Sequence, residues 1–66
     1  MSFYVRRERN GRTGWTGPIR SLRQATRENI AWRNAGWTAT VEPSTPEIRR
    51  QIREWERNIK ADRNIQ

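Results

Sequence analysis

The sequence predicts an α+β fold, in which a three-stranded antiparallel sheet carries one packed helix and the chain ends in an amphipathic helix. Three observations predict this fold. An aromatic and β-branched segment leads to an Asn-Gly pair, the strongest short signal for a β-hairpin. A stretch with helical periodicity follows, with an alternating segment directly after it. A last stretch repeats its apolar residues at helical spacing, so the predicted order is strand, strand, helix, strand, helix, or β-β-α-β-α.

The first predicted element is a hairpin over residues 3 to about 16. It opens with aromatic and β-branched residues, which favour strands. Asn10 and Gly11 fit the central positions of a type I′ turn, because both positions need a positive φ. Gly17-Pro18 is expected to end the second strand near Thr16, because a proline cannot donate to the hydrogen-bond ladder.

Pairing across this turn decides which side chains share a face of the sheet. The expected pairs are Arg9 with Arg12, Arg6 with Trp15 and Tyr4 with Gly17. Phe3 and Val5 then point towards the packed helix, which leaves three side chains on the other face: Tyr4, Arg6 and Trp15. Trp15 either joins Tyr4 and Arg6 in a solvent-exposed patch, or returns to the core through a bulge at Gly14, and we favour the buried position.

A helix is predicted over residues 21 to 35. Ser21 suits the N-cap, and Gln24 three residues later completes a capping box. The stripe that faces the sheet consists of Leu22, Ala25, Asn29 and Trp32, with Thr26 and Ile30 at its edge. Gly36 ends the helix, because it adopts the left-handed conformation without a Cβ penalty. The alternation of apolar and polar residues from 37 to 42 then predicts the third strand.

The second helix is predicted over residues 46 to 61. Thr45 is the expected N-cap, with Ser44 as the alternative, and Pro46 fits the first turn because its missing N–H costs no hydrogen bond there. The apolar stripe consists of Ile48, Ile52, Trp55 and Ile59. The opposite side gathers Arg49, Arg50, Arg53, Arg57 and Lys60. We expect this helix to pack beside the first helix or against a partner.

Composition limits what a chain of 66 residues can do. Residues 1–66 have the length of a single small domain, and a hydrophobic share of 32% makes its core marginal. Cysteine is absent, which excludes disulfides, and so is histidine, the commonest general base and metal ligand. The sequence has neither an apolar run of membrane-spanning length nor a signal-peptide segment, so we expect a cytoplasmic protein, in the host cytoplasm if a phage encodes it.

Catalysis is not expected. The acidic residues are Glu8, Glu28, Glu42, Glu47, Glu54, Glu56 and Asp62. None of them lies in an apolar stretch that would shift its pKa, and none has a base or nucleophile near it in sequence. No metal-ligand spacing and no phosphate-binding glycine loop occurs, so the sequence predicts no catalytic residue, no metal site and no cofactor.

The charge balance is strongly basic. The net charge is +7, and of the fourteen basic residues thirteen are arginine. Arginine is favoured where a planar group contacts phosphate or carboxylate with two hydrogen bonds. A GC-rich genome, in which arginine codons are common, explains the same skew. Under either interpretation the excess charge favours contact with polyanions.

The predicted function is nucleic-acid binding by a small basic accessory protein. The candidate contacts are Arg6, Arg7, Arg9 and Arg12 of the hairpin, and Arg49, Arg53, Arg57 and Lys60 of the second helix. A two-stranded ribbon can enter the major groove, and an aromatic–arginine surface around Tyr4 and Trp15 can stack unpaired bases. Charged hairpins and helix faces also serve solubility and edge protection, which is the simpler interpretation of both surfaces.

A protein–protein interaction module is the alternative function. If the second helix does not fold back, its apolar stripe (Ile48, Ile52, Trp55 and Ile59) becomes a face for a host protein or for a second copy in a homodimer. Trp55 would be the hot spot, and an exposed Tyr4–Trp15 patch would be the other docking surface. Otherwise Trp32, Trp37 and Trp55 are expected in the core, because short chains depend on large aromatic side chains.

Residues 15–43, WTGPIRSLRQATRENIAWRNAGWTATVEP, resemble small orphan proteins of actinobacteria and their phages. The similar features are a strand, a Gly-Pro turn, a Ser-capped helix and an AGW-x-A-x-V strand. The same stretch is similar to one half of a SPOR domain, the repeat that binds peptidoglycan glycans, in which the helix also lies on an antiparallel sheet. The second half of that domain is missing here, so no functional residue is carried over. The first resemblance implies an actinobacterial or phage origin, which supports the GC-rich explanation of the arginine content.

Overall fold

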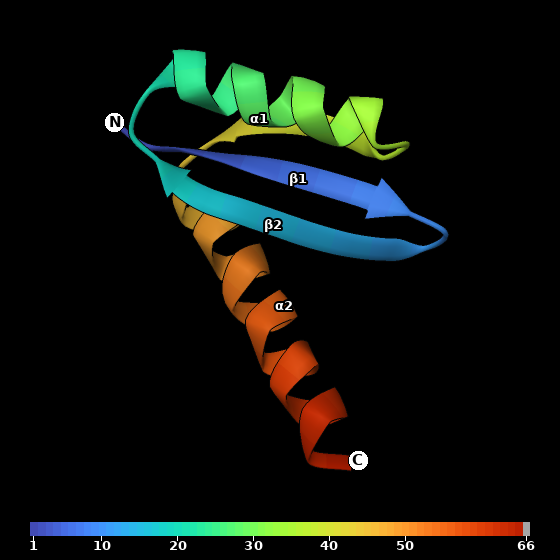
Figure 1. Ribbon diagram of the computed structural model, residues 1–66. Coiled ribbons are helices and arrows are strands. Elements are labelled where there is room, and N and C mark those ends of the chain that lie inside the picture. The colour runs from blue at the N-terminus through green and yellow to red at the C-terminus, as the bar shows by residue number, and fades with distance from the viewer. Residues whose placement is uncertain (66) are drawn as a thin grey trace.

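The computed structural model describes the backbone of residues 1–65 and the side chains of residues 1–59. Along the described chain the elements are β1 (Phe3–Arg9), β2 (Arg12–Ile19), α1 (Leu22–Asn34), β3 (Thr38–Pro43) and α2 (Pro46–Ile65). The strands form an antiparallel sheet in the order β2-β1-β3 (Figure 1). The predicted α+β fold with the order β-β-α-β-α is therefore confirmed.

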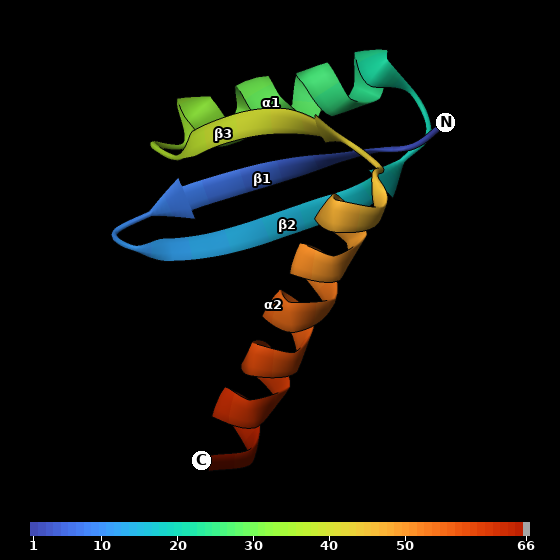
Figure 2. The same cartoon turned by 180° about the vertical axis from the view of Figure 1, so that it is seen from behind.

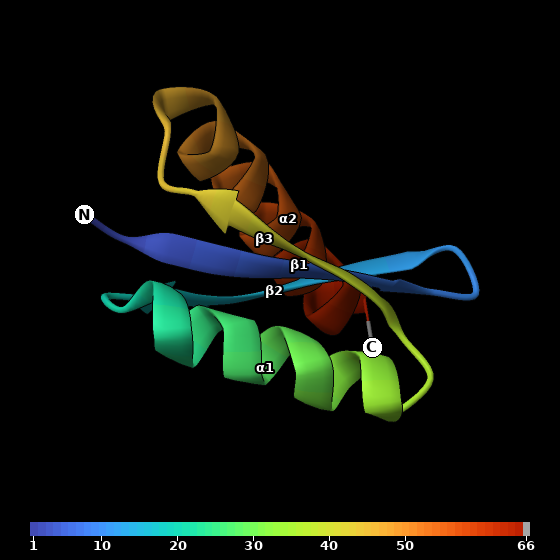
Figure 3. The same ribbon diagram turned by 90° about the horizontal axis from the view of Figure 1, so that it is seen from above.

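The two helices lie on opposite faces of the sheet, as the view from above shows (Figure 3). Between α1 and the sheet lies the core, whose buried residues are Val5, Ala25 and Ala39 and whose half-buried residues are Phe3, Ile19, Trp32 and Val41. Helix α2 starts beyond the end of β3, on the side of the sheet away from α1, and its C-terminal part extends past the sheet (Figure 2). The expectation that α2 packs beside α1 is therefore wrong. The face of Val5 is already covered by α1, and the opposite face is left for α2.

The hairpin turn is the one that the sequence predicts. Asn10 has a φ of 52° and Gly11 a φ of 76°, as a type I′ turn requires. Arg9 lies opposite Arg12 and Arg6 opposite Trp15, which confirms the predicted register over this part of the hairpin.

The sequence predicts that the second strand ends near Thr16. Instead, β2 continues through Gly17-Pro18 to Ile19. It can do so because β2 is an edge strand, where a missing N–H need not interrupt the ladder. The register shifts between Phe3 and Val5, so Ile19 pairs with Phe3 and an irregularity replaces the predicted pairing of Tyr4 with Gly17. Gly17 is needed there, because its φ is +142° and an added Cβ would lie 2.7 Å from Cδ1 of Tyr4.

Trp15 is buried, with 7% of its surface exposed, so the solvent-exposed patch with Tyr4 and Arg6 is wrong and the buried position is confirmed. The cause is not a bulge at Gly14, because Gly14 keeps its regular partner in β1. Helix α2 packs on this face instead, where its Ile52 is 9% exposed. Tyr4 meets the Trp15 ring edge to face, with 6.5 Å between the ring centroids.

The predicted N-caps Ser21 and Thr45 are confirmed. The Ser21 hydroxyl accepts a hydrogen bond of 3.4 Å from the Gln24 N–H, and the Thr45 hydroxyl accepts one of 3.2 Å from the Ile48 N–H. Gly36 adopts a φ of 92° after the end of α1, as predicted. In the part of the chain that the structure describes, no helix combines the length and the apolar character needed to cross a membrane.

Candidate functional site

The end of α1 fixes the position of Trp37. The Trp37 N–H donates to the Trp32 carbonyl at 3.0 Å, and the Gly36 N–H donates to the Arg33 carbonyl at 3.1 Å. This pattern is a Schellman motif, which brings the residue after the glycine against the helix residue five positions earlier. The two tryptophan rings meet edge to face, with 5.6 Å between their centroids. The backbone hydrogen bonds at the end of α1 therefore hold Trp37 against Trp32.

Arg7 packs against this tryptophan pair. Its guanidinium carbon lies 4.2 Å from the Trp32 ring centroid and 5.6 Å from that of Trp37. One guanidinium nitrogen donates to the Thr16 hydroxyl at 2.7 Å. Burial lowers the pKa of the Arg7 guanidinium, and the negative charge of Glu28 opposes that shift. The structure thus places this predicted nucleic-acid contact inside the packing between the hairpin and α1.

Gly14 makes room for Arg7. The two residues are paired across β1 and β2, and a Cβ added to Gly14 would lie 2.8 Å from the Arg7 guanidinium carbon. A side chain at position 14 would push the guanidinium off the Trp32 ring. The glycine that suggested a bulge in the sequence therefore serves the close approach of an arginine.

Arg9 and Arg12 lie at the tip of the hairpin, directly opposite each other and exposed. The guanidinium carbon of Arg9 lies 6.0 Å from the Trp37 ring centroid, and its side chain donates to the Ala35 carbonyl at 3.5 Å. Arg9, Asn10, Arg12 and Trp37 line a shallow hollow. Like charges on directly opposite residues destabilise a strand pair, so this tip is poised to accept an anion.

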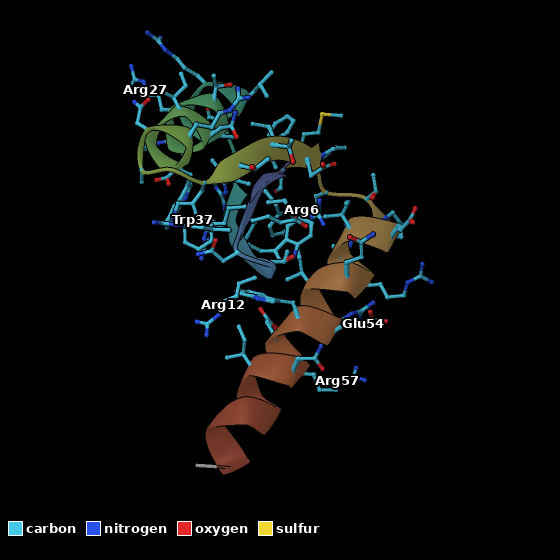
Figure 4. All side chains as sticks on the ribbon, turned by 90° about the vertical axis from the view of Figure 1, so that its right-hand side faces the viewer. Arg6, Arg12, Arg27, Trp37, Glu54 and Arg57 are labelled. Atoms are coloured by element: carbon cyan, nitrogen blue, oxygen red, sulfur yellow. The ribbon has the colours of Figure 1, made fainter. Side chains whose placement is uncertain are left out.

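A groove of about 650 Å³ continues from the hairpin tip to α2, and we call it the hairpin groove. Its lining includes Arg12 and Thr13 of β2, Trp37, and Trp55 and Asn58 of α2. In the side view Trp37 and Arg12 lie on the same side of the molecule, whereas Glu54 and Arg57 point away on the other side of α2 (Figure 4). The groove therefore joins basic and aromatic side chains from three separate parts of the chain.

The remaining predicted contacts among residues 1–59 do not gather at this groove. Arg6 lies on the face of the sheet opposite Arg7. Its guanidinium forms an ion pair with the Glu8 carboxylate at 2.6 Å. Arg49 contacts the Ser44 hydroxyl at 3.3 Å, and with Arg53 it lines a separate hollow beside Tyr4. Arg57 is exposed, and the side chain of Lys60 lies outside the described residues. Of the predicted basic contacts whose side chains the structure describes, only Arg7, Arg9 and Arg12 meet around Trp37.

The tryptophans differ in burial from the sequence prediction. The sequence predicts Trp32, Trp37 and Trp55 in the core. Half-buried Trp32 does pack against the core, whereas Trp37 and Trp55 are half-buried away from it, and Trp15 is the most buried tryptophan. A sheet of this size with one helix on each face leaves the ends of the helices uncovered. The half-buried position of Trp37 could have been predicted from its place directly after Gly36. A Schellman motif puts that residue against the last turn of the helix, not between the helix and the sheet.

Comparison of the chain with protein-family models, with curated proteins and with solved structures finds no match. The functional interpretation therefore depends on the geometry of the hairpin groove and on the charge around it. Among the described residues, no three Asp or Glu side chains come close enough together to hold a metal ion.

Proposed function

We propose that this small basic protein binds nucleic acid through the hairpin groove, as an accessory factor rather than an enzyme. The observation that carries the proposal is the exposed pair Arg9 and Arg12 beside the half-buried ring of Trp37. Two guanidinium groups at one hairpin tip suit bidentate contact with phosphate oxygens. An aromatic ring next to them offers a base a face on which to stack.

The overall charge supports the same ligand. With a net charge of +7, the protein attracts polyanions at long range, and exposed Arg50, Arg53 and Arg57 of α2 add to that field. Phosphate contacts release counterions, so binding should weaken steeply as the salt concentration rises. Arg6 contributes less, because Glu8 already neutralises it.

The test compares two variants of equal charge by the fluorescence anisotropy of a labelled oligonucleotide. One carries Arg9→Glu with Arg12→Glu, and the control carries Arg20→Glu with Arg23→Glu, which change exposed residues away from the groove. The hairpin variant should bind at least about ten-fold more weakly than the control, because it loses specific contacts as well as charge. Equal losses in the two variants, or no binding by the unchanged protein, would overturn the proposal.

A second candidate is docking of a protein partner on α2. The observation in its favour is that Ile52 is buried while Ile48, Trp55 and Ile59 of the same stripe are only half-buried. A partner helix would cover the rest of the stripe. In that case Trp55→Ala should release the partner, whereas Arg9→Glu with Arg12→Glu should leave it bound.

A further inference from the structure

We propose that the hairpin groove holds one unpaired nucleobase stacked on Trp37, with Trp55 lining the same groove, so that the preferred ligand is a single strand. The proposal rests on the proposed function and names its ligand class. Three features of the groove support it: its size, the origin of its aromatic residues, and the polar groups beside them.

The groove is large enough for a small planar group. At about 650 Å³ it falls in the range of ligand sites, roughly 300–1,000 Å³. Gly11 lies along the hairpin side of the groove and contributes no side chain to fill it, whereas the Arg7 guanidinium, which also lines the groove, occupies the space beside Gly14. A Cβ added to Gly11 would meet nothing within 4 Å, so the space beside the turn is open.

The two aromatic residues come from different elements. Trp37 precedes β3 and is fixed against Trp32 by the Schellman motif, with 5.6 Å between the rings. Trp55 comes from α2, and both tryptophans line the groove. A ring that is already held by its neighbour loses little conformational freedom when a base stacks on it. Such a site is prepared for stacking before the ligand arrives.

Two polar side chains that line the groove, Arg12 and Asn58, are available to contact the phosphate and the edge of a bound base. The Arg12 guanidinium at the hairpin tip is placed for the phosphate of the stacked nucleotide. The Asn58 amide of α2 carries both a donor and an acceptor, which lets it pair with the edge of more than one base. The arrangement predicts that the protein discriminates only modestly between bases and strongly prefers single strands to duplexes.

A duplex cannot use this groove in the same way. In a duplex both faces of each base are covered by neighbouring base pairs, and a base reaches an aromatic pocket only by leaving the stack. Single strands expose these faces at little cost, and stacking on tryptophan tolerates any base. Base stacking in the groove therefore favours single-stranded over duplex nucleic acid, whereas the arginines contact the phosphates of both.

The experiment titrates the protein with a short oligothymidylate and with its duplex with oligoadenylate, and follows both tryptophan quenching and anisotropy of the labelled strand. The single strand should bind at least about ten-fold more tightly than the duplex and should quench tryptophan fluorescence. Trp37→Ala should weaken single-strand binding about ten-fold and reduce the quenching, and Trp37→Phe should restore most of the affinity.

A variant outside the core guards against loss of folding. Asn58 is exposed on α2, so Asn58→Glu should leave the fold intact while it places a negative charge in the groove. Gln51→Glu makes the same charge change at an exposed position two helical turns earlier, about 10 Å away, and serves as the matched control. Asn58→Glu should weaken single-strand binding at least about five-fold more than Gln51→Glu does.

The outcomes separate the two proposals. Equal binding of duplex and single strand, with affinity that still depends on Arg9 and Arg12, would overturn the nucleobase site and leave the proposed function standing. Equal effects of Asn58→Glu and Gln51→Glu would overturn it as well. Binding of neither nucleic acid at low salt would overturn the proposed function itself.

Discussion

The Arg7 guanidinium lies 4.2 Å from the centroid of the Trp32 ring and donates a 2.7 Å hydrogen bond to the Thr16 hydroxyl. This contact ties β1 to α1 and to β2 at once. It also changes the role that the hairpin sequence suggests for Arg7, because a guanidinium in this position contributes to the fold rather than to a free basic surface. A binding test that replaces Arg7 would mix folding with affinity, which is why Arg9 and Arg12 are the informative pair.

Replacement of Arg7 should therefore destabilise the protein. Arg7→Leu loses a hydrogen bond from a charged donor and a cation–π contact, so the free energy of unfolding should fall by about 2 kcal/mol in urea titrations. Arg6→Leu, one residue away on the other face, removes only an exposed ion pair and should cost less than about 1 kcal/mol. Equal losses for the two variants would show that the Trp32 contact adds nothing.

Gly14→Ala should disrupt the same contact between Arg7 and Trp32, because position 14 lies beside the Arg7 guanidinium. The added Cβ would lie 2.8 Å from the Arg7 guanidinium carbon, so the arginine must move off Trp32 and the stability should fall by about 1–2 kcal/mol. In a background that carries Arg7→Leu, the same glycine substitution should cost much less. A double-mutant cycle measured by urea unfolding checks this coupling, and additive effects would contradict it.

Local structure is predictable from the sequence because its causes are local. Asn10-Gly11 allows only a few turn types, and Ser21, Gly36 and Thr45 act on backbone groups within a few residues. These residues set the order and nearly all of the boundaries of the elements. One exception is the end of α2, which continues to Ile65 instead of ending near residue 61 as predicted. The other is Gly17-Pro18, where the course of β2 depends on its place at the sheet edge, which is a tertiary property.

The candidate site is less predictable, because it depends on which face α2 covers. The stripe of α2 is evident in the sequence, but its partner on the sheet is not, so the sequence allows two positions for Trp15. The hairpin groove joins Arg12, Trp37 and Trp55, which are far apart in the chain and come together only through tertiary packing. The basic hairpin surface expected from the arginine pattern is divided, because Arg6 pairs with Glu8 on one face and Arg7 donates to Thr16 on the other.

The packing of α2 against the sheet is tested by Ile52. This side chain is 9% exposed on the face of Trp15, so Ile52→Ala should lower the free energy of unfolding by about 2–4 kcal/mol and weaken the near-ultraviolet circular dichroism of the tryptophans. Ile30→Ala removes the same atoms from a residue that is 52% exposed and should change stability by about 0.5 kcal/mol or less. If the two variants unfold alike, α2 is not anchored on this face.

Arg12→Glu should move stability and binding in opposite directions. Arg9 and Arg12 are directly opposite each other at the hairpin tip, and like charges in such a pair are destabilising. A carboxylate opposite Arg9 turns repulsion into attraction, so thermal unfolding should report a gain of about 0.5 kcal/mol. The same change removes a phosphate contact and repels the ligand, so affinity for an oligonucleotide should fall. Arg12→Gln should give a smaller gain in stability and a smaller loss of affinity. A variant that becomes more stable and still binds at full strength would show that the repulsion at the hairpin tip has no connection with anion binding.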